Sequence, residues 1–453
     1  MEEWARNHPF WMALLRVVLW IGPLFLFMPL SIWFERRLLA WMQDRIGPNR
    51  VGNITFSRTS PWVPGFLKGR KFHLRGLLQP VADGIKLLMK EEIIPSAADR
   101  LVYFIAPAIA IFPAFALGAV IPWGPQYQSW TQQPGPYSYL TPVADVNIGV
   151  LYILAASSLG VYGLVLAGYG ANNKYSLLGG LRASAQLISY ELSMGMSIAC
   201  VALASGSIKV TGIVAAQEQP LWGAAKYFQN WNVLTPFGLV AMVVFLVCMV
   251  AETNRPPFDL AEAENELVAG YHTEYSSMKF ASFFMGEYVA MFAFGLLVSA
   301  IFLGGYNALP IRWEALATDY PSAGGFFTFC EKANYWLAPV FFAGKGACVV
   351  IAYIWTRATL PRLRYDQLMS LGWRSLLPVA TLDFIVVALW LVGTRLYGVG
   401  GGYLAAAVAL VLCVVLYLNI ASVRVRARAG SQGSGSALAS RTIELVEPVV
   451  QRQ

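Results

Sequence analysis

The sequence predicts an all-α protein, a polytopic bundle of transmembrane helices. Three observations favour this class. Hydrophobic residues make up 57% of the 453 positions and charged residues only 13%, whereas about 25% of residues are charged in a typical soluble domain. Apolar windows of about 20 residues, long enough to cross the hydrocarbon core of a bilayer, recur along the chain. Charged and turn-forming residues are concentrated between these windows.

Nine predicted spans follow from these windows. The first is too long for the apolar core of a cleavable signal, and it ends in Glu35-Arg36-Arg37 instead of small residues. The last two are joined by a predicted tight turn at 398–402. The alternative there is one kinked helix from 379 to 421, which would be about 65 Å long, roughly twice the bilayer thickness. The predicted spans are 11–34, 101–122, 147–169, 185–205, 235–254, 280–304, 336–356, 379–397 and 403–421.

Basic residues indicate the orientation of the bundle. If the first span leads inward, the inner segments contain 25 lysines and arginines and the outer segments contain five. Because loops rich in positive charge stay in the cytoplasm, the N-terminus is predicted outside and the C-terminus in the cytoplasm. The net charge of +8 is then mainly an orientation signal. Nucleic-acid binding is therefore not expected.

Redox metal ligands are not expected in this chain. Its five cysteines form no close pair, so neither a Cys-x-x-Cys site nor an iron–sulfur cluster is predicted. The three histidines, His8, His73 and His272, lie outside the predicted spans. Paired intramembrane ligands for a b-type haem are therefore lacking from the sequence. If the protein works on electrons, a partner must bring them.

The first inner loop contains a predicted amphipathic helix. Apolar residues step by four, four and three positions from Leu77 to Leu88, and polar residues from Gln79 to Lys90 step by four, three and four on another face. Such a helix is too short and too charged to span, so it is predicted to lie at the membrane interface. It either braces the surface or forms one wall of a slot through which a lipid-soluble ligand enters.

Carboxylates gather between and within the predicted spans. The segment 251–266 follows an apolar run and contains Glu252, Asp259, Glu262, Glu264 and Glu266. If the chain after Pro257 is helical, the first, second and last acids of 259–266 share one face. The alternative is a solvated loop face. The sequence also places Glu191, Glu287 and Lys345 inside apolar spans.

These buried charges predict a proton pathway. A charge at the bilayer centre costs roughly 3 kcal/mol or more on insertion scales, so such groups need water, partners or protons. Carboxylates packed in low dielectric have raised pKa values and can exchange protons near neutral pH. The alternative for any single group is a polar contact that holds two helices together.

Four segments carry a family resemblance, namely 35–52, 76–86, 251–266 and 357–369. Each resembles the NuoH-type membrane subunit of respiratory complex I, the proton-pumping NADH:quinone oxidoreductase. The agreement runs in order from about residue 11 to residue 395. A homologous subunit of a hydrogenase-type or other non-NADH complex remains an alternative. A stand-alone ion transporter is a second alternative, although no internal repeat of the kind common in transporters is visible.

The resemblance implies a subunit that forms the membrane side of a quinone chamber and links quinone reduction to proton pumping. Quinone is then the substrate, and flavin and iron–sulfur clusters are expected in partner subunits. The expected partners are other complex I membrane subunits, the peripheral subunits at the quinone site and membrane lipid. The expected location is a bacterial-type inner (plasma) membrane.

Residues and resemblance together predict two sets of site residues. The predicted proton path comprises Glu35, Glu191, Glu252, Asp259, Glu262, Glu264, Glu266, Glu274 and Glu287. The predicted quinone-site set comprises Arg36, Arg45, Asp83, Lys86, Arg255, Phe258, Arg362 and Arg364. An arginine in the second set can counter the charge of a reduced quinone or pair with a carboxylate; otherwise it only anchors the inner leaflet. No catalytic residue or metal ligand is predicted.

Two segments depart from the family pattern. An insertion at about 53–73 is rich in basic, aromatic and turn-forming residues, which favours either an ordered loop against a partner or anionic lipid, or a mobile surface loop. The other departure is the C-terminus. We expect a family-like domain over 1–399, an extra transmembrane helix at 400–421 and a flexible cytoplasmic tail at 422–453.

Overall fold

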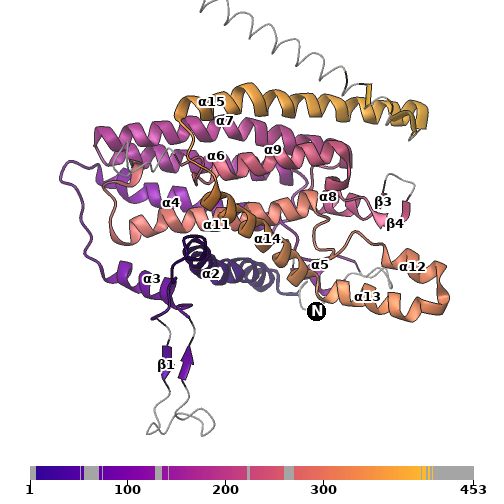
Figure 1. Ribbon diagram of the computed structural model, residues 1–453, viewed down its shortest axis with the longest axis horizontal. Helices are drawn as coiled ribbons and strands as arrows, with labels where there is room; N and C mark the ends of the chain where they lie inside the picture. The colour runs from indigo at the N-terminus through magenta and orange to yellow at the C-terminus, as the bar shows by residue number, and fades with distance from the viewer. Residues whose placement is uncertain are drawn as a thin grey trace, which may run out of the picture. The chain divides into compact units, whose positions relative to one another are not determined.

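The computed structural model describes residues 7–51, 53–55, 71–73, 75–127, 135–140, 142–221, 225–259 and 270–398, with scattered positions from 400 to 411. The chain divides into two units, residues 1–384 and 385–453. The described residues include seven helices long and apolar enough to cross a membrane. The predicted all-α membrane bundle is thereby confirmed (Figure 1).

Eight of the nine predicted spans coincide with helices. Seven are the long ones: α2 (Pro9–Met42), α4 (Arg100–Leu117) continued by η2 (Gly118–Val120), α6 (Gly149–Gly170), α7 (Lys174–Ser205), α11 (Ser277–Phe302), α14 (Ala338–Thr359) and the helix Tyr365–Gly398. The last of these starts as α15 (Tyr365–Leu371) and continues through the π-helical turn η6 (Gly372–Leu376). The eighth is α9 (Pro236–Glu252), which is apolar but shorter.

The predicted boundaries err most at two helix starts: the helix Tyr365–Gly398 begins well before the predicted 379, and α7 is the other case. This helix begins at Lys174, well before the predicted start at 185. Lys174 and Arg182 lower the hydropathy of its first turns, so an apolar window does not include them. The helix nevertheless starts where a cap is available, because the Asn173 side chain accepts a hydrogen bond from the Tyr175 amide at 3.0 Å.

Helix α11 is the most buried of the seven long helices. Of its apolar window, 78% is buried, against 17% for α2. It packs mainly against α4 and α14 and also touches α2, α3 and α9 (Figure 1). Close helix approach elsewhere depends on small residues: a Cβ added at Gly163 of α6 would lie 2.6 Å from the Ala110 backbone of α4.

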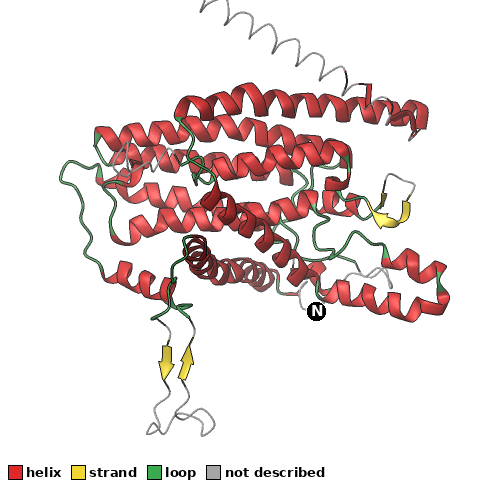
Figure 2. Ribbon diagram, viewed as in Figure 1, coloured by secondary structure: helices red, strands yellow, loops and turns green. Residues whose placement is uncertain are grey.

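One end of the first unit, called here the α12 end, is built from short elements that hydropathy did not predict. They are α5 (Pro136–Leu140), α8 (Val210–Gln217), η3 (Asn232–Leu234), α12 (Trp313–Asp319), η5 (Pro321–Ala323) and α13 (Gly324–Trp336). An antiparallel hairpin of β3 (Pro220–Leu221) and β4 (Ala225–Gln229) completes it (Figure 2). All are too short or too polar to appear as spans.

The opposite end, called here the α3 end, holds the predicted amphipathic helix. Helix α3 (Gln79–Met89) is confirmed, and its apolar residues Val81, Ile85 and Leu88 are exposed. The two ends of the predicted insertion pair as strands β1 (Asn53–Thr55) and β2 (Lys71–His73), with Ile54 opposite Phe72 (Figure 2). The 3-10 turn η4 (Gly270–His272) precedes α11 at this end.

The helix Tyr365–Gly398 continues into the second unit and ends at Gly398. This glycine has a φ of +75°, in the left-handed region that favours glycine. A Cβ added at Gly402 would lie 2.0 Å from the Thr394 hydroxyl oxygen, so the backbone after Gly398 closely approaches the helix before it. The ninth span, 403–421, and the tail lie almost wholly outside the described residues. They remain predictions, as do the proposed domain boundaries.

Candidate functional site

Glu35 is a buried carboxylate on α2 with partners on two other helices. It is 6% exposed. The Tyr288 hydroxyl of α11 donates a hydrogen bond of 2.8 Å to its Oε2 atom. Arg357 of α14 forms an ion pair with its other oxygen. Glu35 therefore joins α2, α11 and α14 through one charged and one neutral donor.

Glu287 lies one residue before Tyr288 and has its own arginine. Arg255 Nη2 is 2.8 Å from Glu287 Oε2, and the side chains are 6% and 10% exposed. The Arg255 guanidinium also lies over the Tyr288 ring at 4.6 Å from its centroid. Because Tyr288 contacts both groups, the Glu35 pair and the Glu287 pair are adjacent. Breaking a buried ion pair by removing one partner costs about 3–5 kcal/mol.

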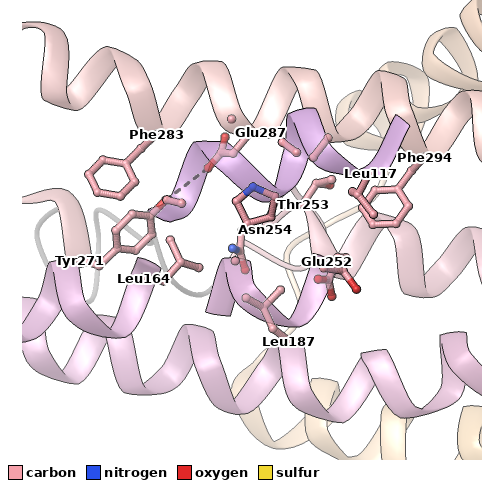
Figure 3. Close-up of a pocket in the computed structure, with 17 residues that line it drawn as sticks. Leu117, Leu164, Leu187, Glu252, Thr253, Asn254, Tyr271, Phe283, Glu287 and Phe294 are labelled. Atoms are coloured by element: carbon pink, nitrogen blue, oxygen red, sulfur yellow. Dashed lines mark hydrogen bonds between the residues drawn. The ribbon is translucent and has the colours of Figure 1, made fainter. Parts of the chain in front are cut away.

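A small cavity extends from Glu287 toward the end of α9 (Figure 3). Its volume is about 80 Å³, and Glu252, Asn254 and Tyr271 also line it. The Tyr271 hydroxyl donates to Glu287 Oε1 at 3.3 Å. One oxygen of Glu252 is buried without a hydrogen-bond partner among the described residues. Two carboxylates from different helices thus border one cavity, which has the volume to hold water.

Glu191 is the next acid in this series. It lies on α7, and its hydrogen-bond partner Ser157 lines the same cavity as Glu252. Two serines of α6 satisfy it: Ser157 donates at 3.1 Å, and Ser158 donates a further hydrogen bond. Glu35, Glu287, Glu252 and Glu191 therefore form a succession of neighbours, which we call the carboxylate series.

The segment after α9 is held in place by Gln186 of α7. Its amide nitrogen, Nε2, donates to the backbone carbonyls of Ala251 and Phe258 at 2.8 and 2.9 Å, and it lies 3.2 Å from Asn254 Oδ1. Phe258 is 5% exposed and packs edge-on against Tyr190. Gln186 itself is fully buried. The start of the acid-rich segment is thus fixed to α7, whereas residues 260–269 lie outside the described part of the chain.

Asp259 ends the described part of that segment and meets a partner from the loop after α14. Arg362 Nη2 is 3.1 Å from Asp259 Oδ2; Asp259 is buried, and the Arg362 side chain is 51% exposed. The Leu363 amide donates to the Pro257 carbonyl at 3.1 Å. Arg362 thus contacts a buried carboxylate while remaining accessible from outside.

A second pair, Arg36 and Asp83, connects α2 to α3. Arg36 Nη1 is 2.6 Å from Asp83 Oδ2, with both side chains partly exposed. The other Asp83 oxygen accepts from Gln79 Nε2 at 3.0 Å. At the far end of α3, Ser277 of α11 donates to the Leu87 carbonyl at 2.8 Å. Helix α3 is therefore anchored to both helices that carry the Glu35–Glu287 contacts.

Not every predicted site residue joins these groups. Lys86, Arg45 and Arg364 are exposed, and the Arg45 side chain donates a hydrogen bond of 2.7 Å to the Gln43 side chain. Glu274 stands apart from the carboxylate series and accepts a hydrogen bond of 2.7 Å from Asn173. The predicted acids that lie outside the described residues are Glu262, Glu264 and Glu266.

Sequence reasoning missed several residues that connect the series. Tyr288, Tyr271 and Arg357 carry no local signal, since a tyrosine or a basic residue near a span end is ordinary. The sequence did offer one clue, because a carboxylate that interrupts a span needs a partner, water or a proton. No group of three or more metal-ligating side chains exists among the described residues.

A separate polar network lies at the α12 end. Gln217 of α8 donates to the Ala300 carbonyl at 2.8 Å, and Asn232 donates to the Ile301 carbonyl at 2.6 Å. Lys345, the lysine predicted inside a span, donates to the Leu303 carbonyl at 2.5 Å. These side chains satisfy backbone carbonyls at the end of α11, which would otherwise lack partners. Lys345 therefore has hydrogen-bond partners in the structure, and its role there is to hold the end of α11.

Comparison with known proteins identifies the family. A family model described as NADH dehydrogenase matches residues 15–388. The H subunit of NADH-quinone oxidoreductase from Thermomicrobium roseum is 44% identical over 370 residues, covering 81% of this chain and 91% of the relative. The H subunit from Streptomyces avermitilis is 41% identical, covering 84% and 74%. One of the H subunits from Koribacter versatilis is 41% identical, covering 83% and 96%. This multi-pass membrane chain therefore belongs to the NADH dehydrogenase family that includes the H subunits of NADH-quinone oxidoreductases.

Proposed function

We propose that this chain, as the H-type subunit of an NADH-quinone oxidoreductase, forms the membrane side of the quinone chamber and couples quinone reduction to proton translocation. The observation that supports this most directly is the carboxylate series, in which Glu35, Glu287, Glu252 and Glu191 lie on four helices and adjoin one another. Electrons would arrive through flavin and iron–sulfur clusters in partner subunits, because the chain's own role is electrostatic.

The proposed quinone-facing groups are the arginines of the Arg36–Asp83 and Arg362–Asp259 pairs. Arg36 and Arg362 each bind a carboxylate yet remain accessible. Reduction of a quinone adds two electrons, and until two protons follow, negative charge develops on its oxygens. Such a charge would attract a nearby guanidinium and weaken its existing pair. Arg45, Lys86 and Arg364 would add to the positive field there.

The charge change would then reach the carboxylate series. Arg362 follows Arg357, the partner of Glu35, by five residues in the chain, and the two like charges repel each other. If either arginine changes position, the free energy needed to keep Glu35 ionised changes. Since Tyr288 contacts both Glu35 and Arg255, the Arg255–Glu287 pair would respond next. A carboxylate that loses its cation in a buried site takes up a proton. Protons would thus move along the series as pairs break and re-form.

Glu262, Glu264 and Glu266, which lie outside the described residues, are proposed as further members of the proton path. Glu262, Glu264 and Glu266 follow directly on Asp259, and Glu274 lies beyond them. We also propose the orientation predicted from loop charge, with the N-terminus outside and the α3 end in the cytoplasm of a bacterial-type plasma membrane. This orientation would place the Arg36–Asp83 and Arg362–Asp259 pairs on the side where the peripheral subunits bind.

The test is Glu287→Gln in the intact complex. Gln keeps the shape but cannot be ionised, so Arg255 would lose its counter-charge. We expect protons pumped per electron to fall about tenfold or more in inverted membrane vesicles. NADH:quinone reductase activity and the amount of assembled complex are measured on the same vesicles.

The matched control is Asp319→Asn, which removes one carboxylate charge from an exposed pair with Lys226 at the α12 end. Its pumping ratio should equal that of the unmodified complex. A normal ratio in assembled Glu287→Gln would remove Glu287 from the path. The assembly part of the proposal is tested separately by purification through a tag on this chain. We expect flavin and iron–sulfur proteins to co-purify with it.

A further inference from the structure

A stripe of exposed and half-buried side chains runs along one face of α2 to its end, with Trp33 and Arg37 half-buried. It comprises Leu26, Leu30, Trp33, Arg37 and Trp41, spaced four, three, four and four residues apart, so the five side chains share one helix face. Leu26 is 66% exposed, Leu30 40% and Trp41 58%. The stripe is thus apolar over its first two residues and cationic–aromatic over its last three.

Arg37 is held between the two indoles. Its guanidinium carbon lies 5.7 Å from the centroid of the Trp33 ring and 5.4 Å from that of the Trp41 ring. Arg37 Nη1 donates to the Arg75 carbonyl at 3.1 Å, and the Trp33 indole N–H donates to the same oxygen at 3.2 Å. Cation–π contacts and these bonds fix the guanidinium before any ligand arrives.

The base of the β1–β2 hairpin brings further positive charge to this place. Gly76 packs so closely on Pro48 that an added Cβ would lie 2.2 Å from the Pro48 carbonyl oxygen. Arg50 and Arg75, both exposed, flank this contact along the chain. Across 36–51 there are four arginines and a single carboxylate, Asp44. Arg36 already pairs with Asp83, on a different face of α2.

We propose that this face of α2 is a binding site for an anionic glycerophospholipid. The phosphate headgroup binds Arg37 beside the two tryptophans, and an acyl chain lies along Leu30 and Leu26. Tryptophan and arginine at a helix end match the headgroup level of a bilayer, and surface arginines attract anionic lipid. The apolar half of the stripe distinguishes a lipid from free phosphate. This site is separate from the proposed quinone and proton groups.

The experiment uses the whole complex in vesicles of phosphatidylcholine with a minor share of phosphatidylglycerol. A phosphatidylglycerol carrying a photoreactive diazirine on its acyl chain is the probe, and labelled peptides are identified by mass spectrometry. We expect labelling at the peptide that contains Leu26 and Leu30. In Arg37→Gln it should fall about fivefold, the change expected for one surface cation at an anionic membrane.

The control is Arg374→Gln, which removes an exposed arginine beside Trp373 on another membrane helix and should leave α2 labelling unchanged. Trp41→Leu, at an exposed position, keeps the test valid if Arg37→Gln fails to assemble; it should reduce labelling about twofold. Equal labelling by a phosphatidylcholine probe, or unchanged labelling in Arg37→Gln, would overturn the proposal. So would full competition by inorganic phosphate, which would indicate a simple anion site.

Discussion

The middle of α11 and its C-terminal end are stabilised by different chemistry. Toward the α3 end, Glu287 and Tyr288 contact Arg255 and Glu35, so the helix is held by ionised groups. At the α12 end, its last carbonyls are held by the neutral amides of Gln217 and Asn232, together with a lysine. Both sets are buried, and both join α11 to several other elements.

The difference separates a responsive region from a fixed one. The energy of an ion pair depends on the charge of each partner, so a proton or a nearby anion changes it. An amide–carbonyl hydrogen bond does not change with proton uptake over the working pH range. Helix α11 is therefore anchored at the α12 end, while the contacts near its middle can rearrange. Three substitutions test this contrast, in decreasing order of effect.

The largest effect is expected from Arg255→Met. It leaves the Glu287 carboxylate buried without its main counter-charge, which should destabilise the protein by about 3–5 kcal/mol. Thermal unfolding of the purified complex and the amount of assembled subunit measure this loss. The double variant Arg255→Met with Glu287→Gln removes both charges and should regain most of the stability. If the double variant is no more stable than Arg255→Met, the pair is not the source of the effect.

A smaller effect is expected from Gln217→Leu at the α12 end. This change leaves the Ala300 carbonyl and the Gly304 amide without their Gln217 partner, at a cost of about 1–3 kcal/mol. Protons pumped per electron should stay unchanged, because no charge is altered. The control is Gln219→Leu, two residues along and exposed. A lowered pumping ratio in Gln217→Leu would contradict the division between the middle of α11 and its C-terminal end.

The smallest effect concerns Glu218, an acid at the α12 end that sequence reasoning did not select. It lines a cavity of about 380 Å³ and accepts a hydrogen bond of 3.3 Å from Asn307. Burial raises the pKa of Glu218 above its ordinary 4.5, although the hydrogen bonds from Tyr306 and Asn307 lower it. A raised folded-state pKa favours the protonated form. Glu218 therefore contributes its full stabilisation of the folded protein below pH 4.5, and this contribution is lost as pH rises through the raised pKa.

Glu218→Gln should flatten this dependence. The variant should match the unmodified protein at low pH and become slightly more stable above the raised pKa, where the native carboxylate is buried as an anion. Thermal midpoints across the pH range provide the measurement. Identical pH profiles for the two proteins would show that Glu218 does not titrate differently on folding.

The sequence located the carboxylates that interrupt the spans, but it did not locate their partners. Glu191 and Glu287 were found because a charge inside an apolar span is costly wherever the span lies. Their partners could not be found in this way. Tyr288 is 253 residues from Glu35, and Arg357 is 322 residues from it. Nothing in either local sequence specifies that contact. The short elements of the α12 end were missed for a related reason, since hydropathy windows detect only long apolar helices.

By itself, the sequence determined that the chain crosses a membrane, where eight of its helices lie and which carboxylates require partners. Composition and spacing within about 20 residues are sufficient for these conclusions, because the cost of burying charge in lipid is local. Only the tertiary structure decided that Glu35, Glu287, Glu252 and Glu191 are neighbours. It also decided that Arg37 lies between two indoles and donates to the Arg75 carbonyl. Those contacts depend on how the helices pack, which is set by side chains distant in the sequence.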